Sequence, residues 1–496
     1  MAQINKPSDY FNTALYTGDG SSSHSINGSR KLKNSYKKIG SDTGAIESIT
    51  GLENYSTSTN GFYLTAPGGY DSGIQIDLGD SYTVQRVEWF SKADYGRFKN
   101  YKIKYSTDDS TYTEISDMTG SGIATGTSTN ILVASNSNGM ATATFANKTA
   151  RYIQILFDDY HAGSNNNCKL AALGIFVDEL KQSFQPDWVW IKERSSTSSH
   201  FIYDAIRGVN VKLSSNTTDA DSTVADSMTS FDSDGFTVGN NGATNENGQT
   251  VVAWNWLASN TTASNTDGSI TSSVSANTDS GFSIVSYTGT GANATVGHGL
   301  GSAPKIIIVK NRTDSGTGFY TYVDALGNAN GLFLNDTSGS LGFSSVWNST
   351  SPTNDVFTVH TNNGVNGSGD NIIAYCFAEK KGFSKFGEYT GNGSTDGTFI
   401  YTGFKPAFVM IKEYSGAAAH WMMYDNKREG YNVDNDHLKA SASDAEGTSD
   451  DMDLLSNGFK MRTSGGGENG NGDKYIYMAF ASEPLVGTNN IPATAR

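Results

Sequence analysis

The sequence contains little cysteine, few charged residues and no long hydrophobic run. Two cysteines among 496 residues exclude a disulfide framework and a metal site built from thiolates. No apolar stretch reaches the roughly 18 residues that indicate a transmembrane helix, so we expect no membrane insertion. Charged residues make up 17% of the chain, and their balance gives a net charge of −15. That charge disfavours binding to nucleic acid or to an anionic membrane surface.

Glycine, serine, threonine and asparagine are abundant instead. The 55 glycines suit tight turns, and residues of this kind weaken helix interiors. Two stretches show the strands that such turns would join. Ile306–Val309 is a β-branched run, and Phe282–Tyr287 alternates with the period of a strand. The composition and these patterns predict an all-β protein.

Two phrases each recur three times along the chain. The first contains Tyr-Thr-Gly and the second ends with a lysine; they occur at Leu15–Gly20, Ser286–Gly291 and Glu388–Gly393, and at Phe184–Lys192, Ser302–Lys310 and Phe404–Lys412. The tyrosine of the first phrase precedes the proline of the second by 17 residues in copies two and three, but by 170 in copy one. The difference, 153 residues, is enough for an inserted domain.

We therefore predict three copies of one module, the first of them split. Module A comprises residues 1–26 and 183–265, with an inserted domain at 27–182; module B spans 266–380 and module C spans 381–496. Each unit has the size of a small domain, so we expect each module to bury its own core and the modules to form a semi-rigid rod. The predicted fold class is all-β, with tandem jelly-roll-like β-sandwich modules.

The insert carries four further phrases in a fixed order. They read IDLG at Ile76–Gly79, KIKYSTD at Lys102–Asp108, ARYI at Ala150–Ile153 and LAALGI at Leu170–Ile175. In this order, over residues 30–178, they resemble the discoidin family, also known as the coagulation-factor C-terminal domain. The resemblance implies a jelly-roll sandwich whose end loops bind sugars, lipid head groups or proteins, often with a structural calcium ion. The Asp-Gly-Asn calcium phrase of the family is not visible near Asn54, so the sequence does not support calcium.

Three segments match the ligand-binding loops of that family. The candidate ligand-binding residues are Tyr55, Tyr95, Arg97, Asp159, Tyr160 and His161. An exposed aromatic ring stacks on the C–H face of a sugar, and a neighbouring Arg or His bonds its hydroxyls. The alternative is that these are ordinary loop aromatics with no ligand.

The rest of the chain resembles a module of structural proteins in tailed phages, especially marine ones. The phrases that carry this resemblance are QPDWVWIK at Gln185–Lys192, SFDSDGF at Ser230–Phe236, YTGNGSTDGTF at Tyr389–Phe399 and YIYMAFA at Tyr475–Ala481. The resemblance implies a structural or adhesive β-domain of a tail fibre or another virion appendage. It carries no catalytic residues.

The sequence shows no constellation of catalytic or metal-binding residues. The seven histidines occur singly, and Gly465–Gly467 is followed by Glu468 rather than by the Lys of a phosphate loop. Acidic pairs such as Asp158-Asp159 offer a glycosidase its two carboxylates, but an acidic chain contains such pairs by chance. We therefore expect no enzymatic activity and no cofactor. An Asp recurs in each module, at Asp204, Asp324 and Asp425, where we expect it to accept backbone N–H groups at a strand end.

These observations predict a phage virion structural protein, a tail fibre or appendage that attaches to a glycan of the host surface through the insert. Its expected partners are other virion proteins and the host glycan or receptor, and we expect a homo-oligomer, with a trimer favoured. The polar start of the chain shows no signal peptide, so we expect synthesis in the host cytoplasm and function in the virion. The alternatives are a capsid decoration, head fibre or tail adaptor with a purely structural role, and then a tailspike glycosidase.

Overall fold

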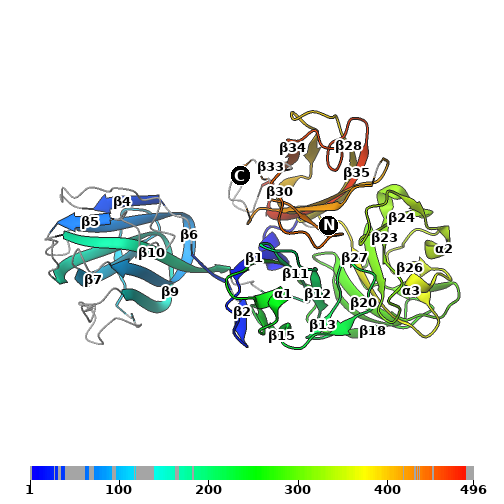
Figure 1. The fold of residues 1–496 in the computed structure, drawn as a ribbon, viewed down its shortest axis with the longest axis horizontal. Coiled ribbons are helices and arrows are strands. Elements are labelled where there is room, and N and C mark those ends of the chain that lie inside the picture. Colours follow the sequence, from blue (N-terminus) through cyan, green and yellow to red (C-terminus); the bar gives the residue numbers. More distant parts are fainter. Residues whose placement is uncertain are drawn as a thin grey trace. The chain divides into compact units, whose positions relative to one another are not determined.

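The computed structural model consists mainly of β-strands. It describes residues 3–26, 28–31, 35–39, 62–65, 72–91, 97–116, 118, 139–161, 167–180, 184–416, 418–428, 432, 434, 436–449 and 452–486. The chain divides into two compact units (Figure 1): unit 1 is Met1–Asn27 with Gln182–Arg496, and unit 2 is Gly28–Lys181. Within the described ranges, no helix is long and apolar enough to cross a membrane.

Unit 1 contains three antiparallel sheets with one common strand order. In module A the order is β1-β17-β11-β12, with strands at Phe11–Thr17, Thr250–Trp256, Trp188–Glu193 and Phe201–Asp204. In module B it is β20-β27-β22-β23, at Phe282–Thr288, Asn371–Phe377, Ile306–Asn311 and Phe319–Val323. In module C it is β28-β35-β30-β31, at Ser384–Thr390, Lys474–Pro484, Phe404–Glu413 and Trp421–Asp425. β1 pairs with β17 along its whole length, so residues on the two sides of the insert share one sheet.

A smaller sheet packs on each of these three sheets. The small sheets are β15-β16-β2 (Met228–Asp232, Gly235–Val238, His24–Ile26), β21-β26 (Ala294–Gly297, Val356–Val359) and β29-β34-β33 (Phe399–Tyr401, Gly458–Met461, Met452–Leu455). A separate hydrophobic cluster lies in each module; that of module A contains Val189, Ile191 and Phe236. Each module is therefore a two-layered β-sandwich.

The opposite faces of the three large sheets meet in one shared core. Trp188 and Trp254 of module A, Tyr375 of module B, and Phe408 and Phe480 of module C belong to a single buried cluster. Each module has a core of its own, as expected, but the additional shared core shows that the expectation of a rod is wrong. The physical reason is that every residue of β11 is buried, so this strand has no solvent face for a free-standing sandwich.

Further short elements extend or connect these sheets. They are η1 (Pro7–Asp9), β13 (Val211–Lys212), β14 (Ser222–Thr223), α1 (Gly242–Asn245), β18 (Ala263–Asn265), β19 (Ser272–Asn277), η4 (Asp324–Leu326), β24 (Asn330–Phe333), β25 (Leu341–Gly342), α2 (Ser344–Trp347), α3 (Asn363–Asn366) and β32 (Leu438–Lys439). β19 and β18 extend the module B sheet beyond β20. The outer edges of β1 and β28 carry no further strand among the described residues.

The Tyr-Thr-Gly phrase has the same hydrogen bonds in all three modules. In module B the hydroxyl of Tyr287 donates to the carbonyl of Val365 at 2.6 Å, and the side chain of the next residue, Asn366, accepts from the N–H of Thr290 at 2.7 Å. Gly289 is required by close packing, since a Cβ there would lie 2.1 Å from the carbonyl oxygen of Gly367. The phrase therefore ties an early strand of each module to the turn that precedes the last strand of that module.

Unit 2 is built around two long strands. β6 (Ser72–Ser91) pairs with β9 (Gly139–His161) from Ser72 opposite Phe157 to Ser91 opposite Gly139. The other strands of this sheet are β3 (Gly28–Lys31), β4 (Ser35–Ile39), β5 (Phe62–Thr65), β7 (Arg97–Ser106), β8 (Thr113–Glu114) and β10 (Asn167–Leu180). β4 and β7 lie beside the first part of β6 and the last part of β9, whereas β10 pairs with the last part of β6. The alternating buried residues Ile74, Ile76, Ile153 and Ile155 belong to its core.

Candidate functional site

Ends of β6, β7 and β9 meet at one edge of unit 2, which we call the candidate edge. Arg97, the first residue of β7, lies opposite His161, the last residue of β9. Ser72 at the start of β6 lies opposite Phe157, close to the end of β9. The pairing of β6, β7 and β9 thus brings Ser72, Arg97 and His161, which are far apart in the sequence, to one end of the β6–β9 ladder.

The structure describes the backbone of four of the six candidate ligand-binding residues. Tyr55 and Tyr95 lie outside the described residues. Arg97, Asp159, Tyr160 and His161 were expected in loops, but they lie in the end regions of β7 and β9. The ladder continues through two register shifts, between Phe98 and Asn100 and between Asn100 and Tyr101, before it ends at the pair of Arg97 and His161. Such irregular pairing is not visible in a sequence, which explains the loop expectation. Their role in binding stays a prediction.

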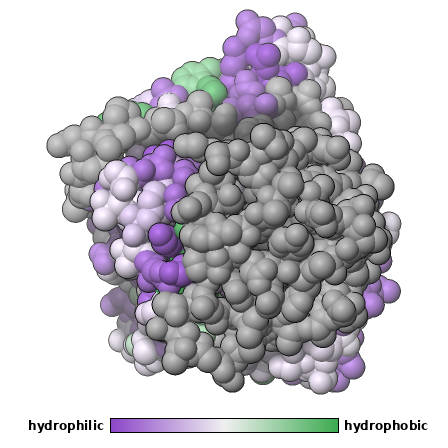
Figure 2. All heavy atoms as spheres, turned by 90° about the vertical axis from the view of Figure 1, so that its left-hand side faces the viewer, coloured by the Kyte–Doolittle hydropathy of each residue, from purple (hydrophilic) through white to green (hydrophobic). Residues whose placement is uncertain are grey.

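The chain enters and leaves the insert at one end of β10. Gly28, the first residue of β3, pairs with Leu180, the last residue of β10, whereas Asn167 begins β10 beside Thr65. The chain connections of the insert therefore lie beside the last residues of the 14-residue strand β10. Among the residues that Figure 2 colours, hydrophilic ones predominate.

Several described polar groups of unit 2 are paired with one another. Arg151 forms an ion pair with Asp77 at 3.0 Å, and the buried Gln75 donates to Asp109 at 2.8 Å. Asp108 accepts the N–H groups of Ser110 and Thr111 at 2.9 and 3.0 Å, and these bonds hold its pKa well below the usual range. The KIKYSTD phrase therefore specifies a hairpin turn and not a binding group.

In unit 1 the most unusual polar group is a buried cluster between modules A and B. The carboxylate of Asp204 accepts the N–H groups of Ile206 and Arg207 at 3.1 and 2.9 Å, which confirms the expected strand-end role. It also accepts from the guanidinium of Arg207 at 2.5 Å and from the hydroxyl of Tyr375, in module B, at 2.8 Å. Because the side chains of the ion pair are fully buried, its loss would leave a charge without a partner.

The same arrangement occurs between modules C and A. Asp425 forms a buried ion pair with Arg428 at 2.6 Å and accepts the indole N–H of Trp254, in module A, at 3.0 Å. Burial alone would raise the pKa of Asp425, but Arg428 and the other donors hold it below its usual value. Between modules B and C the pattern is absent: Asp324 of module B is exposed, pairs with Lys305 at 2.7 Å and has Gly327 in place of the arginine.

Equivalent loops close the three modules into a ring. Arg312 of module B pairs with Asp221 of module A at 2.6 Å, and Arg194 of module A pairs with Glu446 of module C at 2.6 Å. Between modules B and C, the N–H of Ser340 donates to the carbonyl of Tyr414 at 2.9 Å. Each module therefore contacts both others. The two buried ion pairs of unit 1 are explained by this ring.

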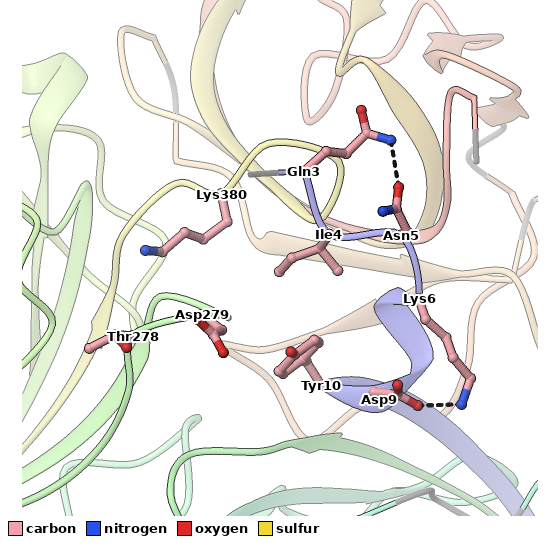
Figure 3. A pocket seen from close by; sticks show the side chains of 9 residues that line it. All are labelled: Gln3, Ile4, Asn5, Lys6, Asp9, Tyr10, Thr278, Asp279 and Lys380. Carbon is pink, nitrogen blue, oxygen red and sulfur yellow. Dashed lines mark hydrogen bonds and ion pairs between the residues drawn. The ribbon is translucent and has the colours of Figure 1, made fainter. Parts of the chain in front are cut away.

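One cavity of unit 1 is lined by charged residues at the start of the chain (Figure 3). It has a volume of about 400 Å³ and is bordered by Lys6, Asp9, Tyr10, Asp279 and Lys380 among others. Lys6 pairs with Asp9 at 2.6 Å, and the two side chains are substantially exposed. The backbone of Ile4 donates to the carbonyl of Lys381 at 3.0 Å, so the cavity lies where the first residues of the chain attach to the connection between modules B and C.

A second cavity, of about 430 Å³, lies in module C beside His420 and Gly465–Gly467. Nδ1 of His420 lies 2.9 Å from the hydroxyl of Ser441. No carboxylate in the described part of the chain hydrogen-bonds the other ring nitrogen, so the pair lacks the third group of a hydrolytic triad. No group of three metal-ligating side chains occurs among the described residues.

Comparison with known families assigns both units. Residues 177–484 match the family described as "Domain of unknown function (DUF7483)", which covers well over half of the chain. The chain belongs to this family. Residues 25–172 match the F5/8 type C domain, so the insert is a discoidin-like β-sandwich, as the sequence phrases indicate. No curated protein matches the DUF7483 chain.

Several solved structures are similar to the insert of this DUF7483 protein. CpGH89CBM32-5 from Clostridium perfringens, in complex with GalNAc-β-1,3-galactose, is 16% identical, with 29% of this chain and 94% of that chain covered and a TM-score of 0.21. CBM32-1 from a family 31 glycoside hydrolase of the same organism is 17% identical, with 30% and 97% covered and a TM-score of 0.24. The CBM32 of AlyQ in complex with 4,5-unsaturated mannuronic acid is 20% identical, with 30% and 98% covered and a TM-score of 0.21.

Proposed function

We propose that this protein is a non-catalytic, glycan-binding component of a phage virion appendage, in which the F5/8 type C insert contacts the host surface. The observation that carries the proposal is the pair of Arg97 and His161 at the edge of unit 2 where strand ends gather. The phage part of the proposal is supported by the phrases of the three modules alone.

The closed ring of unit 1 suits a scaffold role. Its three modules bury a common core, and fully buried ion pairs bridge two of their three junctions, so it supplies a rigid base rather than a hinged arm. A virion that carries many copies would convert weak monovalent sugar contacts into firm attachment through avidity. Other virion proteins and a homo-oligomer, with a trimer favoured, belong to the same proposal.

Glycan binding by the full chain tests the proposal. The full-length protein is applied to an array of microbial surface glycans, and the dissociation constant of the best binder is measured by calorimetry. Arg97→Ala and His161→Ala should each weaken binding about tenfold, because each removes groups that bond sugar hydroxyls. Arg30→Ala is the matched control: it lies in the same domain but in β3, opposite Val177 near the chain connections.

Three results would contradict the proposal. If Arg97→Ala and His161→Ala bind as wild type does, the edge is not the site. If no glycan binds and the protein instead co-purifies within virions with the insert covered by a neighbouring virion protein, the purely structural role is correct. Release of reducing ends from a bound polysaccharide would identify an enzyme.

A further inference from the structure

The small sheet of module C ends in an edge strand that exposes two aromatic side chains. In β29 the side chains of Phe399 and Tyr401 are 45% and 57% exposed, whereas Ile400 between them is buried. The sheet order is β29-β34-β33, so β34 covers one edge of β29 and no described strand covers the other. Residues two apart on a strand point to the same side, so both rings face solvent together.

The corresponding positions of the other modules carry small or polar residues. Ile400, Val296 and Ile26 are equivalent, because each lies opposite a phenylalanine of the neighbouring strand. By this alignment Phe399 corresponds to Thr295 in module B and to Ser25 in module A, and Tyr401 corresponds to Gly297. The two exposed aromatics are therefore a feature of module C and not a requirement of the fold.

In module B the equivalent edge is covered by the chain itself. The N–H of Ile270 donates to the carbonyl of Thr295 at 3.0 Å, and Asn265 comes so close that a Cβ on Gly297 would lie 1.7 Å from its Oδ1. A side chain at the position of Gly297 is incompatible with this cover. Because module C has Tyr401 there, its edge cannot accept an extended segment in the same way, and the rings remain available to another kind of ligand.

The polar groups beside the two rings have no net charge. Phe399 lies opposite Lys460, and Lys460 lies opposite Asp453 on β33, so all three side chains share one face of the sheet. Lys460 forms an ion pair with Asp396, and Arg462 lies 3.8 Å from Asp396 and 3.5 Å from Asp453. Two cations thus balance two anions, which favours an uncharged ligand over an acidic or basic one.

Tyr401 has free space beside its ring. It lies opposite Gly458, which has no side chain to cover it. Gly458 is itself required, since a Cβ there would lie 2.0 Å from the carbonyl oxygen of Ile400. A flat ligand can therefore approach Tyr401 over the neighbouring strand while it also reaches Phe399, about 7 Å along β29.

We propose that Phe399 and Tyr401 form a second binding site, for an uncharged oligosaccharide, on module C. The two rings would stack on the apolar faces of sugar rings, and the ion-paired side chains would bond their hydroxyls. This site lies in unit 1 and shares no residue with the candidate edge of the insert. It stands or falls independently of the insert's role.

The test uses the full chain with Arg97→Ala and His161→Ala already introduced, so that the candidate edge of the insert is removed. Affinity gel electrophoresis is run in gels containing dextran, laminarin or galactomannan as neutral polysaccharides, and alginate as an acidic one. At least one neutral polysaccharide should retard the protein. Tyr401→Ala or Phe399→Ala should then raise the apparent dissociation constant roughly fivefold or more, and Tyr401→Trp should retain binding. Leu341→Ala, which removes an exposed apolar side chain of module B, should have no effect.

The following results would overturn the inference. Retardation by alginate alone, by no neutral polysaccharide, or without change in Tyr401→Ala would show that the rings do not bind a neutral glycan. Binding of a synthetic peptide of residues 266–272 at β29 would show that the edge takes an extended strand instead. If Tyr401→Ala in the otherwise wild-type chain abolishes all binding and Arg97→Ala does not, the insert proposal fails and this one stands. If Arg97→Ala abolishes all binding and Tyr401→Ala does not, this proposal fails and the insert proposal stands.

Discussion

Trp254 of module A donates its indole N–H to the buried carboxylate of Asp425 in module C, across 3.0 Å. Tyr375 of module B makes the equivalent bond to Asp204 of module A. At the third junction, between modules B and C, the equivalent residue of β35 is Met478, whose side chain has no hydrogen-bond donor. The matching acid, Asp324, is exposed. At each junction the hydrogen-bond donor and the buried acid are thus either both present or both absent. The ring consequently has two junctions with a buried acid and one junction without.

Trp254→Phe should destabilise unit 1 by about 1–3 kcal/mol. The substitution keeps an aromatic ring in the shared core but removes one donor from a fully buried carboxylate. The free energy of unfolding, measured by urea denaturation, gives the difference. Met478→Leu is the matched control, because it changes the same strand position where no acid is present; it should cost less than about 1.5 kcal/mol. Equal losses in both variants would show that the hydrogen bond contributes nothing.

The strands could be predicted from the sequence, but the closed ring of three modules could not. Alternation and β-branched runs predict strands because one face of a sheet is apolar, and a repeated phrase predicts a repeated sandwich. These patterns do not say what covers a second apolar face. The signal was nevertheless present in Trp188 to Ile191, where every residue is large and apolar; Trp188 and Trp190 enter the shared core, and Val189 and Ile191 enter the core of module A.

The candidate site was predictable only in part. Phrase order located the insert, and the family match supports the sandwich. The proximity of Arg97 and His161 could not be read from the sequence, since it depends on the register between β7 and β9 and on two irregular pairings in that ladder. The sequence analysis did not find Phe399 and Tyr401. A comparison of the three modules position by position would have shown these two aromatics where modules A and B have small or polar residues.

Removal of module C should expose the shared core, whereas removal of the insert should not. A chain that ends at residue 380 uncovers apolar side chains such as Phe11, Trp254 and Trp256, each of which contributes about 1.5–3 kcal/mol when buried. We expect this variant to bind a hydrophobic fluorescent dye and to aggregate. The control replaces residues 28–181 with a short Gly-Ser linker and should keep a cooperative thermal transition. A soluble, cooperatively folding 1–380 fragment would contradict the shared core.

Gly289→Ala should be strongly destabilising although it adds only one methyl group. The added Cβ would lie 2.1 Å from the carbonyl oxygen of Gly367, so the turn that Tyr287 and Asn366 hold would have to move. We expect a loss of about 2–4 kcal/mol in the free energy of unfolding. Gly342→Ala, where no atom lies within 4 Å of the added Cβ, should change it by less than about 0.5 kcal/mol. Similar effects of the two substitutions would refute the steric explanation.

His200 should make the ring less stable in acid. It is fully buried, its Nδ1 accepts from the indole N–H of Trp190 at 2.8 Å, and its Nε2 donates to the carbonyl of Lys439, in module C, at 2.9 Å. Burial, with the nearby Lys192 as a second cause, lowers its pKa from 6.5 to about 3. Between pH 6.5 and 3 the unfolded chain therefore binds a proton that the folded chain does not bind.

The sign follows from that difference in bound protons: stability from His200 is complete above pH 6.5 and is lost as the pH falls toward 3, with a slope of about 1.4 kcal/mol per pH unit. Asp187, whose pKa is raised by burial to about 6, acts in the opposite direction between pH 3.8 and 6, so the wild-type curve alone is not diagnostic. His200→Gln keeps one donor and one acceptor but cannot be protonated. Urea unfolding of both proteins from pH 7 to pH 4 should show a shallower loss for the variant. Parallel curves would mean that His200 is not the acid-sensitive contact between modules A and C.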